Sequence, residues 1–374
     1  MRILHMILSM TGGGAERQLA YVAPALSTRG HDVHLAFVFP GVNGERLGGT
    51  GCTLHRLATS GRRNPLLLLE SMSLVRRLRP GVVQTWLAHM DLVGGATARL
   101  LRVPWVMSER SAALSYPASM MNRFRIAAGR RADLIMPNSR GGADYWLANG
   151  VDADRIEVVP NYVPLGEIEM ADALDDPRIA ADDELVVYVG RLSPEKNLHA
   201  LIDAFAHVVR LRPRAMFAFC GDGQLLAELK THVEAAGLRE RFIFTGFVPN
   251  VASWLKRASA SVAVSRCEGH PNAVLEAIAA GVPLVVSDIP AYRSILDDES
   301  AAFVPVDDVL AIAGAVVQTL ENRVAAEERA ARARAALGSP SLDATAARYE
   351  NAYQHAIAID AARRGRPVAR SLTS

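Results

Sequence analysis

Two glutamates, Glu268 and Glu276, stand eight residues apart in the segment RCEGHPNAVLEAIAAGVP at residues 266–283. On one continuous helix they would be separated by about 12 Å along the axis and roughly 80° around it, a poor arrangement for carboxylates that share a proton. Gly269 and Pro271 interrupt the run, so we expect Glu268 in a loop and Glu276 on the helix that follows. The spacing predicts different tasks for the two carboxylates.

The helix predicted from Asn272 is almost wholly apolar and ends at Gly281, with Pro283 just beyond, the expected order of stop signals. Glu276 is the one charged residue on it, and burying a carboxylate without a partner is costly. Glu276 therefore either binds a partner or lies on a solvent-facing stripe, and this segment alone leaves both interpretations open.

Two cations follow the strand predicted at 185–189, in the sequence GRLSPEKNLHALIDAF. Arg191 and Lys196 flank a Ser-Pro turn, and ligands of open α/β sheets bind at this end of the strands. Together the cations would neutralise a diphosphate and would help most as a leaving group gains charge. The alternative is that they pair with Glu195 or other surface acids.

Glycine-rich turns follow other predicted strands. TGGGAERQ opens a helix after the first strand, and its backbone NH groups are suited to phosphate, although the turn could simply require glycine. NAD is not expected, because Arg17 stands where the third glycine of the dinucleotide fingerprint would fall and no acidic residue ends the second strand. CGDGQLL and FTGFVPN end two later strands, on the same edge as Arg191 and the helix at 272.

Titratable residues also end two predicted strands of the first half. QTWLAHMDLVGG (84–95) carries His89 and Asp91, and SERSAALS (108–115) carries Glu109 and Arg110. A lone histidine is more often structural than catalytic, but its place at a strand's carboxyl end leaves both roles open for His89.

The chain has 374 residues, half of them hydrophobic and about a fifth charged, which indicates a folded protein of two domains. Three widely spaced cysteines without a histidine cluster favour a reducing compartment and argue against a disulfide scaffold or a structural zinc site. The first apolar run is typical of a buried strand rather than a signal peptide, and no stretch approaches the roughly 20 apolar residues of a membrane span. These features predict a cytoplasmic protein.

Charge is divided unevenly along the chain. Residues 1–168 contain 19 Arg, no Lys and 12 acidic residues, a balance of +7, whereas the remainder has a balance of −5. A basic half suits an anionic partner such as a membrane surface or a lipid-linked phosphate. Arginines gather in particular at Arg62, Arg63, Arg76, Arg77 and Arg79 and along NRFRIAAGRRADLI (122–135), part of which is predicted to lie in a membrane interface as an amphipathic helix. Ordinary solvated arginines are the alternative.

Short apolar runs alternate with helical patterns throughout, the signature of doubly wound parallel sheets in an α/β fold. In the first half we expect strands at 2–9, 32–39, 82–86, 104–108, 133–136 and 156–159, with helices at 15–29, 66–78 and 139–148. The rhythm stops near 163–183, a predicted linker, and restarts at 185–190. The predicted domains are residues 1–165 and 166–345, followed by a C-terminal helix and frayed basic tail at 346–374 that packs back toward the first domain.

As a set, these residues resemble the family-four glycosyltransferases. GGGAERQLAYVAPALSTRGHDV, VVPNYV, VVYVGRLSPEKNLHALIDAF, FCGDG, FTGFV and EGHPNAVLEAIAAGVPLVVSD occur in the family's order, and the last is its E-x7-E signature. The resemblance implies the GT-B architecture, two facing Rossmann-like domains with an interdomain cleft.

The resemblance also implies site roles. Glu276 would bind the donor ribose, Glu268 would lie beside the donor sugar, Arg191 and Lys196 would bind the diphosphate, and His89 would lie near the acceptor. As catalytic residues it implies Glu268, His89, Arg191 and Lys196. As donor-binding residues it implies Gly13, Gly14, Arg191, Lys196, Gly221, Gly246, Val248, Gly269, His270, Pro271, Asn272 and Glu276. His270 departs from the aromatic or aliphatic residue that many members carry.

The expected reaction is transfer of a sugar, with retention, from a nucleotide-diphosphate sugar to a hydroxyl of a glycan or lipid-linked acceptor in polysaccharide or glycolipid synthesis. UDP is favoured on family prevalence, and no metal or other cofactor is expected, since no Asp-x-Asp motif ends a strand. Nucleic acid is not an expected partner, and peripheral attachment to the inner face of the membrane is a further expectation. The alternatives are a nucleotide-sugar epimerase of the same architecture and a non-catalytic protein that binds nucleotide sugars or glycans.

Overall fold

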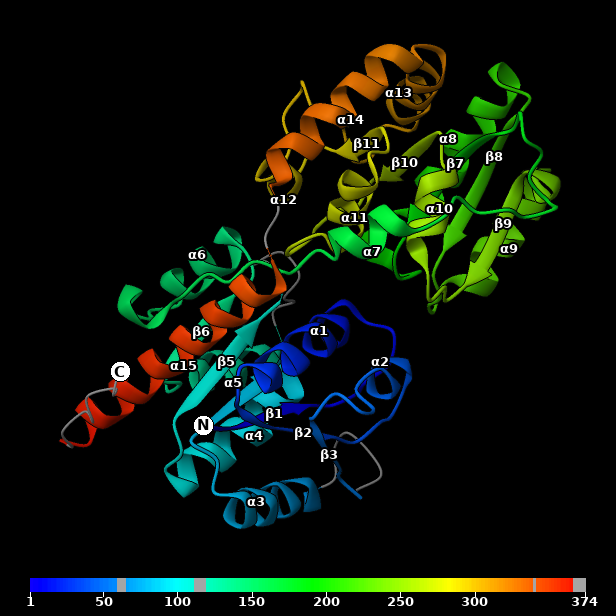
Figure 1. Ribbon diagram of the computed structural model, residues 1–374. Helices are drawn as coiled ribbons and strands as arrows, with labels where there is room; N and C mark the ends of the chain where they lie inside the picture. Colours follow the sequence, from blue (N-terminus) through cyan, green and yellow to red (C-terminus); the bar gives the residue numbers. More distant parts are fainter. Residues whose placement is uncertain (59–64, 111–118, 339–340, 366–374) are drawn as a thin grey trace. The chain divides into compact units, whose positions relative to one another are not determined.

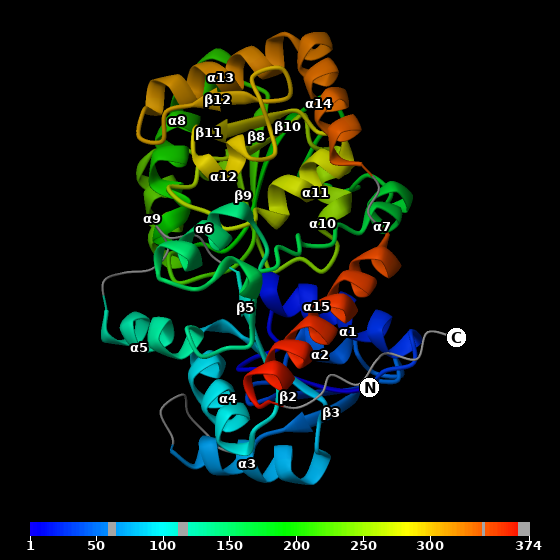
Figure 2. The same cartoon turned by 90° about the vertical axis from the view of Figure 1, so that its left-hand side faces the viewer.

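The computed structural model describes residues 1–58, 65–110, 119–338 and 341–365 (Figure 1). The chain divides into two compact units, the first comprising Met1–Tyr162 and Pro340–Ser374 and the second Val163–Ser339. Each unit contains one six-stranded parallel sheet with helices on both faces (Figures 1 and 2). The predicted α/β class with two doubly wound sheets is confirmed.

The first sheet has the strand order β3-β2-β1-β4-β5-β6. Its strands are β1 (Arg2–Ile7), β2 (Asp32–Phe37), β3 (Thr53–Arg56), β4 (Val82–Trp86), β5 (Trp105–Glu109) and β6 (Leu134–Pro137). Its helices are α1 (Gly14–Thr28), α2 (Val42–Glu45), α3 (Leu66–Leu78), α4 (Leu87–Leu101), α5 (Met120–Gly129), α6 (Arg140–Ala148) and α15 (Leu342–Arg363).

Two apolar clusters cover the two faces of this sheet. On one face α1 and α15 lie side by side, and Tyr349 and Tyr353 of α15 are buried with Leu19 of α1 (Figure 1). The opposite cluster includes Leu74 of α3 and Met90 of α4. The C-terminal helix is therefore a structural part of the first unit.

The second sheet has the order β12-β11-β10-β7-β8-β9. Its strands are β7 (Glu184–Val189), β8 (Ala215–Cys220), β9 (Phe242–Gly246), β10 (Ala260–Ala263), β11 (Leu284–Ser287) and β12 (Ala302–Val304). Its helices are α7 (Leu165–Met170), α8 (Leu198–Leu211), α9 (Leu226–Ala235), α10 (Val251–Arg257), α11 (Asn272–Ala280), α12 (Pro290–Arg293), α13 (Val309–Glu321) and α14 (Arg323–Leu337).

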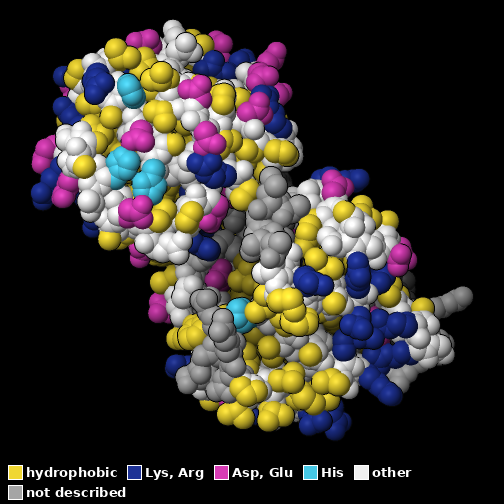
Figure 3. Space-filling view, turned by 180° about the vertical axis from the view of Figure 1, so that it is seen from behind, with side chains coloured by type: hydrophobic (Ala, Val, Ile, Leu, Met, Phe, Trp, Pro, Cys, Tyr) yellow, Lys and Arg dark blue, Asp and Glu magenta, His cyan; other side chains and the backbone are white. Residues whose placement is uncertain are grey.

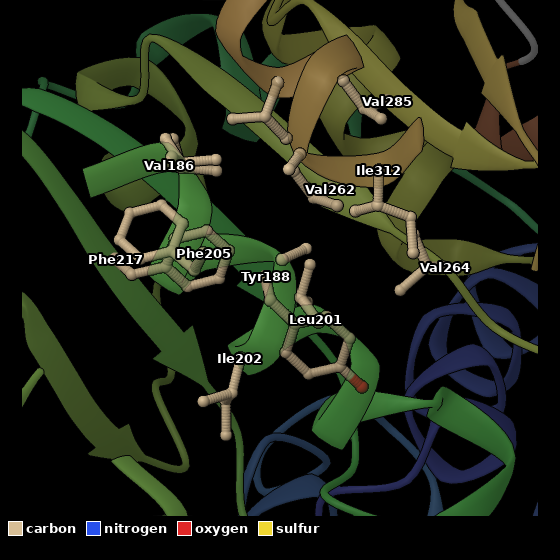
Figure 4. Packing of buried hydrophobic residues seen from close by; sticks show 14 of the residues in the cluster. Val186, Tyr188, Leu201, Ile202, Phe205, Phe217, Val262, Val264, Val285 and Ile312 are labelled. Carbon is tan, nitrogen blue, oxygen red and sulfur yellow. The ribbon is translucent and has the colours of Figure 1, made fainter. Parts of the chain in front are cut away.

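Apolar side chains alternate onto both faces of this sheet as well. On one face Phe205 of α8 packs on Phe217 of β8, with ring centroids 3.8 Å apart (Figure 4). On the other face Ile278 of α11 and Tyr292 of α12 are buried. Burial on both faces explains why these strands are near-continuous apolar runs in the sequence.

Three sequence-based assignments need correction. Residues 156–159 form no strand, and Ile156 makes only an isolated bridge with Ile135. Edge strand β3 was not predicted, because its sequence TLHR lacks an apolar run. The predicted linker 163–183 contains α7, whose Ile168 is buried in the core of the second unit, so these residues belong to that unit.

No single helix in the described ranges is long and apolar enough to cross a membrane. Helices α13 and α14 pass the same test of length and composition only when taken as a pair, and they are bent by 100° at their junction.

Candidate functional site

The topological switch point of the second sheet lies between β7 and β10. These strands are neighbours in the sheet although β8 and β9 come between them in the sequence. In open α/β sheets the crevice at the carboxyl ends of such strands is the usual ligand site. The loop after β7 carries Arg191 and Lys196, and the loop after β10 carries Glu268. The three residues therefore share one edge of the sheet.

Backbone contacts tie the neighbouring loops together at this edge. Leu192 N donates to Asp222 O at 3.0 Å, which joins the loops after β7 and β8. Gly221 forms a bridge with Gly246 at the end of β9, so Val248 follows on the same edge. Arg266 N donates to Glu195 O at 2.8 Å, which joins the loops after β10 and β7. The structure thus brings together the four loops that the sequence placed on one rim.

Gly221 explains part of this close fit. Its φ of +159° is disfavoured for other residues, and a Cβ at this position would lie 1.9 Å from the carbonyl oxygen of Gly190. Only glycine allows the loops after β7 and β8 to approach this closely.

Lys196 and Glu268 form an ion pair with 2.5 Å between Nζ and Oε1, and their side chains are 18% and 16% exposed. Glu195 instead accepts a hydrogen bond from the Ser193 hydroxyl at 2.6 Å. The pairing of Lys196 with Glu195, an alternative in the sequence, is therefore not the arrangement found. Arg191 is exposed, and no ion pair of its guanidinium occurs within the described residues.

Two residues that the sequence reasoning missed hold the same carboxylate. Ser265 Oγ donates to Glu268 Oε1 at 2.8 Å, and the hydroxyl of Tyr292 lies 3.4 Å from this oxygen. Ser265 stands three residues before Glu268, whereas Tyr292 comes from α12. Nothing in the sequence spacing of Tyr292 indicates this contact.

Helix α11 follows the Glu268 loop and ends as predicted, with Gly281 in the left-handed conformation at φ 72°. Gly269 and His270 are half-buried in the loop and Pro271 is buried before the first turn. Asn272 and Glu276, four residues apart, lie on one face of the helix. Glu276 is only 6% exposed, so the solvent-facing interpretation is wrong.

In the first unit, the topological switch point of the sheet lies between β1 and β4. The glycine turn with Gly13 and Gly14 follows β1, and His89 lies in the first turn of α4, which begins directly after β4. The turn is covered by a carboxylate: Glu16 is buried, accepts a hydrogen bond from Ser9 Oγ at 2.9 Å and packs against Gly13. A phosphate at this turn would meet that negative charge unless the Glu16 side chain moved.

Asp91 and Glu109 prove to be parts of a buried ion cluster. Arg125 Nε donates to Asp91 at 2.8 Å and its Nη1 donates to Glu109 at 2.9 Å, while Trp146 Nε1 donates to Glu109 at 2.9 Å. Asp91 and Glu109 are fully buried and Arg125 is 2% exposed. The cluster fixes α5 against α4 and β5, and Arg125 is removed from the predicted basic surface.

Arg110 also has a structural setting. Its guanidinium lies 4.3 Å from the centre of the Trp86 ring and donates to the Tyr349 hydroxyl at 2.6 Å and to Asn161 Oδ1 at 3.0 Å. Arg110 thereby joins the end of β5 to α15.

Within the described ranges, no group of three or more His, Cys, Asp or Glu side chains is arranged to hold a metal ion.

Comparison with known proteins matches both units to family models. Residues 12–167 match the model described as Glycosyltransferase Family 4, and residues 171–336 match that described as Glycosyl transferases group 1. The chain is a family-four glycosyltransferase. Sequence reasoning reached the same family through the E-x7-E signature and the glycine turns.

Two curated relatives support the enzymatic class. The chain is 29% identical over 329 residues to N-acetylgalactosamine-N,N'-diacetylbacillosaminyl-diphospho-undecaprenol 4-alpha-N-acetylgalactosaminyltransferase of Campylobacter jejuni, covering 81% of this chain and 85% of the relative. It is 28% identical over 275 residues to UDP-Gal:alpha-D-GlcNAc-diphosphoundecaprenol alpha-1,3-galactosyltransferase of Escherichia coli, covering 69% of this chain and 70% of the relative.

Solved structures share the fold. Anabaena HepE in complex with UDP-glucose has a TM-score of 0.81 at 18% identity and covers 94% of this chain and 98% of its own. Sucrose-phosphate synthase from Thermosynechococcus elongatus has a TM-score of 0.79 at 19% identity, with 96% and 100% covered. The GT-B fold class and the glycosyltransferase activity inferred from the sequence are both confirmed.

Proposed function

We propose that this glycosyltransferase moves a sugar, with retention of configuration, from a UDP-sugar to a hydroxyl of a lipid-linked glycan. The observation that carries the donor half is the shared edge of the second sheet, where Arg191, Lys196, Glu268 and the α11 start meet. The relatives' names support the proposed acceptor, because both names specify a diphospho-undecaprenol-linked substrate.

On the donor, Arg191 and Lys196 bind the diphosphate and Glu276 binds the ribose hydroxyls. The backbone from Gly269 to Asn272 reads the hydroxyls of the sugar, with Glu268 beside it. Three observations support this assignment: Arg191 is exposed, Lys196 already faces an anion, and Glu276 shares a helix face with Asn272. Gly221 and Gly246 form a bridge on the same edge, which joins the ends of β8 and β9 beside these residues.

During transfer, the acceptor oxygen forms a bond to the anomeric carbon on the face from which the diphosphate departs. The bond from that carbon to the diphosphate oxygen breaks with its electron pair, and the acceptor hydroxyl proton passes to the departing phosphate oxygen. Arg191 and Lys196 stabilise the charge that grows on the diphosphate, which lowers the barrier because the gain is largest in the transition state. No metal is part of this scheme.

Retention is supported by the linkages in the relatives' names. Both are named for alpha linkages, and the second for UDP-Gal as donor. An alpha-linked donor sugar transferred with retention gives an alpha-linked product. His89, in the first turn of α4, is proposed to lie near the acceptor hydroxyl, a role that only the family resemblance implies.

A lipid-linked acceptor also implies work at a membrane surface, and we include peripheral docking of the first unit at an anionic leaflet. Helix α5 presents Met120, Met121 and Phe124 outward, at 59%, 40% and 58% exposure, beside the exposed Arg123. Leu69 of α3 is 60% exposed. Arg76, Arg77 and Arg79 are exposed at the end of α3, whereas Arg62 and Arg63 lie outside the described residues. Figure 3 shows apolar and cationic side chains on one side of this unit.

The test is a transfer assay with purified protein, a polyprenyl-diphosphate-linked glycan and a panel of UDP-galactose, UDP-glucose and UDP-N-acetylgalactosamine, with GDP-mannose as the contrasting donor. We expect one UDP-sugar to be consumed only when acceptor is present, with an alpha-linked product by NMR coupling and unchanged rate in EDTA. A beta-linked product would exclude retention. Interconversion of the donor sugar without acceptor would favour an epimerase, and donor binding without turnover would favour a non-catalytic protein.

A further inference from the structure

We infer that Ser265 and Tyr292 are positioning residues for Glu268: their hydroxyls hold one carboxylate oxygen, so that the other faces the donor sugar. The inference deepens the proposed function and rests on it. Neither residue has a role in the proposed function as stated above.

The hydrogen bonds of Glu268 are unevenly shared between its two oxygens. Oε1 accepts from Lys196 Nζ at 2.5 Å and from Ser265 Oγ at 2.8 Å, with the Tyr292 hydroxyl at 3.4 Å. No donor within the described part of the chain contacts Oε2. Because the side chain keeps 16% of its surface exposed, Oε2 is the atom with capacity for a ligand hydroxyl.

Both hydroxyls are held in place by the packing of their residues. Ser265 follows β10 closely, is 1% exposed, and its carbonyl accepts a hydrogen bond from Ser287 Oγ at 2.6 Å. Tyr292 is fully buried in the core of the second unit. Their oxygens therefore occupy fixed positions, and fixed donors orient a carboxylate at no cost in side-chain ordering when the substrate arrives.

Lys196 differs from these two donors because it has a second task. In the proposed function its ammonium also binds the donor diphosphate, so two anions share one cation once the donor is bound. Ser265 and Tyr292 are neutral and stay with Glu268 when Lys196 turns toward the diphosphate. Burial, with the Glu268 charge beside it, raises the pKa of Tyr292 well above its usual range, so the phenol remains a donor at neutral pH.

Tyr292→Phe and Ser265→Ala remove one hydroxyl each, and Ser265→Thr retains it. Tyr353→Phe is the matched control, because it removes a fully buried phenol that donates to Gln84 and belongs to the first unit, whereas Glu268 belongs to the second. For each variant we would measure the melting temperature, the Kd of UDP by calorimetry, and kcat and KM with the UDP-sugar that the wild type uses.

The positioning role predicts a specific pattern. Ser265→Ala is expected to lower kcat/KM roughly ten-fold or more and Tyr292→Phe by less, since its contact is longer, while the Kd of UDP stays within about two-fold. The preference for the UDP-sugar over UDP should fall in parallel. Ser265→Thr should recover part of the loss, and Tyr353→Phe should change only the melting temperature.

Two outcomes would overturn the inference. In the first, well-folded Ser265→Ala and Tyr292→Phe proteins keep wild-type kcat/KM and sugar preference. In the second, UDP and UDP-sugar affinities fall equally, which means that the hydroxyls only support the loop. Failure of the wild type itself to transfer sugar is a different result, and it would remove the proposed function and the inference with it.

Discussion

Arg191 and Lys196 follow the same strand, yet they stand in different electrostatic surroundings. Lys196 is paired with Glu268 and 18% exposed, whereas Arg191 is exposed. In the proposed function, the two cations therefore start from different states before the donor diphosphate binds. Substitution of Arg191 breaks no ion pair among the described residues. Substitution of Lys196 leaves the partly buried Glu268 carboxylate without its cation.

We predict that Arg191→Ala lowers kcat by roughly 10²-fold with little change in donor affinity, because diphosphate charge grows as the sugar bond breaks. Lys196→Ala should show a similar loss of kcat and, unlike Arg191→Ala, a lower melting temperature. Steady-state kinetics with calorimetric donor binding and thermal unfolding separate these effects. Variants that raise KM while leaving kcat at the wild-type value would contradict the transition-state role of these cations.

The candidate residues on this edge could be read from the sequence, but their partners could not. The strand ends and the E-x7-E spacing identified Arg191, Lys196 and Glu268. Lys196 and Glu268 are 72 residues apart, and the partners that the sequence suggested for Lys196 were Glu195 or other surface acids. The choice between them depends on the strand order, which puts β10 beside β7.

At the level of elements, the loops after β7 and β8 meet through a glycine. We predict that Gly221→Ala destabilises the protein by about 1–3 kcal/mol and weakens UDP binding, because its Cβ would lie 1.9 Å from Gly190 O. Gly237→Ala is the control: it also has a positive φ, of +69°, but nothing lies within 4 Å of its Cβ. It should lose stability without losing UDP affinity. Equal UDP affinity in both variants would show that the loop contact is irrelevant to the donor.

The Asp91–Arg125–Glu109 cluster joins three elements and contains two carboxylates for one cation. Burial raises the pKa of Asp91 from 3.8 to about 6, even with Arg125 beside it. The folded protein thus binds this proton more tightly than the unfolded chain. The contribution of protonated Asp91 to the free energy of unfolding is therefore present below about pH 4 and is lost as the pH rises through about 6.

Asp91→Asn removes this titration while retaining the shape of the side chain. We predict that the free energy of unfolding of the variant, minus that of the wild type, rises between about pH 4 and pH 6.5 and is constant above about pH 7. Urea unfolding across this range measures the difference. His5, whose pKa burial lowers to about 3, titrates in both proteins and cancels. A difference that does not vary with pH would exclude Asp91 as the titrating group.

Strands and helices could be predicted from the sequence where apolar runs were long. They could not be predicted where the structure depends on contacts with residues far away in the sequence. β3 is a four-residue edge strand without an apolar run, and α7 owes its place to packing of Ile168 in the second core. Arg125 stands among other arginines in the sequence, so only the fold reveals that it turns inward to residues 16 and 34 positions away. Such errors arise because burial is set by distant partners.

For the whole molecule, the most general property is the division of charge, with +7 on residues 1–168 and −5 on the remainder. The exposed side chains Met120, Met121 and Phe124 lie on the basic unit, next to Arg123. An apolar stripe flanked by cations is typical of a helix that lies in a membrane interface. Because Arg125 is buried, this basic surface has fewer exposed arginines than the sequence suggested.

We predict that the protein co-sediments with vesicles containing anionic phosphatidylglycerol at low salt and is released at high salt, since each arginine near the surface contributes about 1 kcal/mol and salt screens it. Phe124→Ser should weaken binding roughly ten-fold, as expected for about 1.5 kcal/mol of lost apolar burial. Met170→Ser is the matched control, because Met170 is 80% exposed but belongs to the acidic second unit, and it should bind like the wild type. If the wild type stays in the supernatant with anionic vesicles at low salt, or if both variants bind equally, docking through α5 is wrong while the transferase assignment stands.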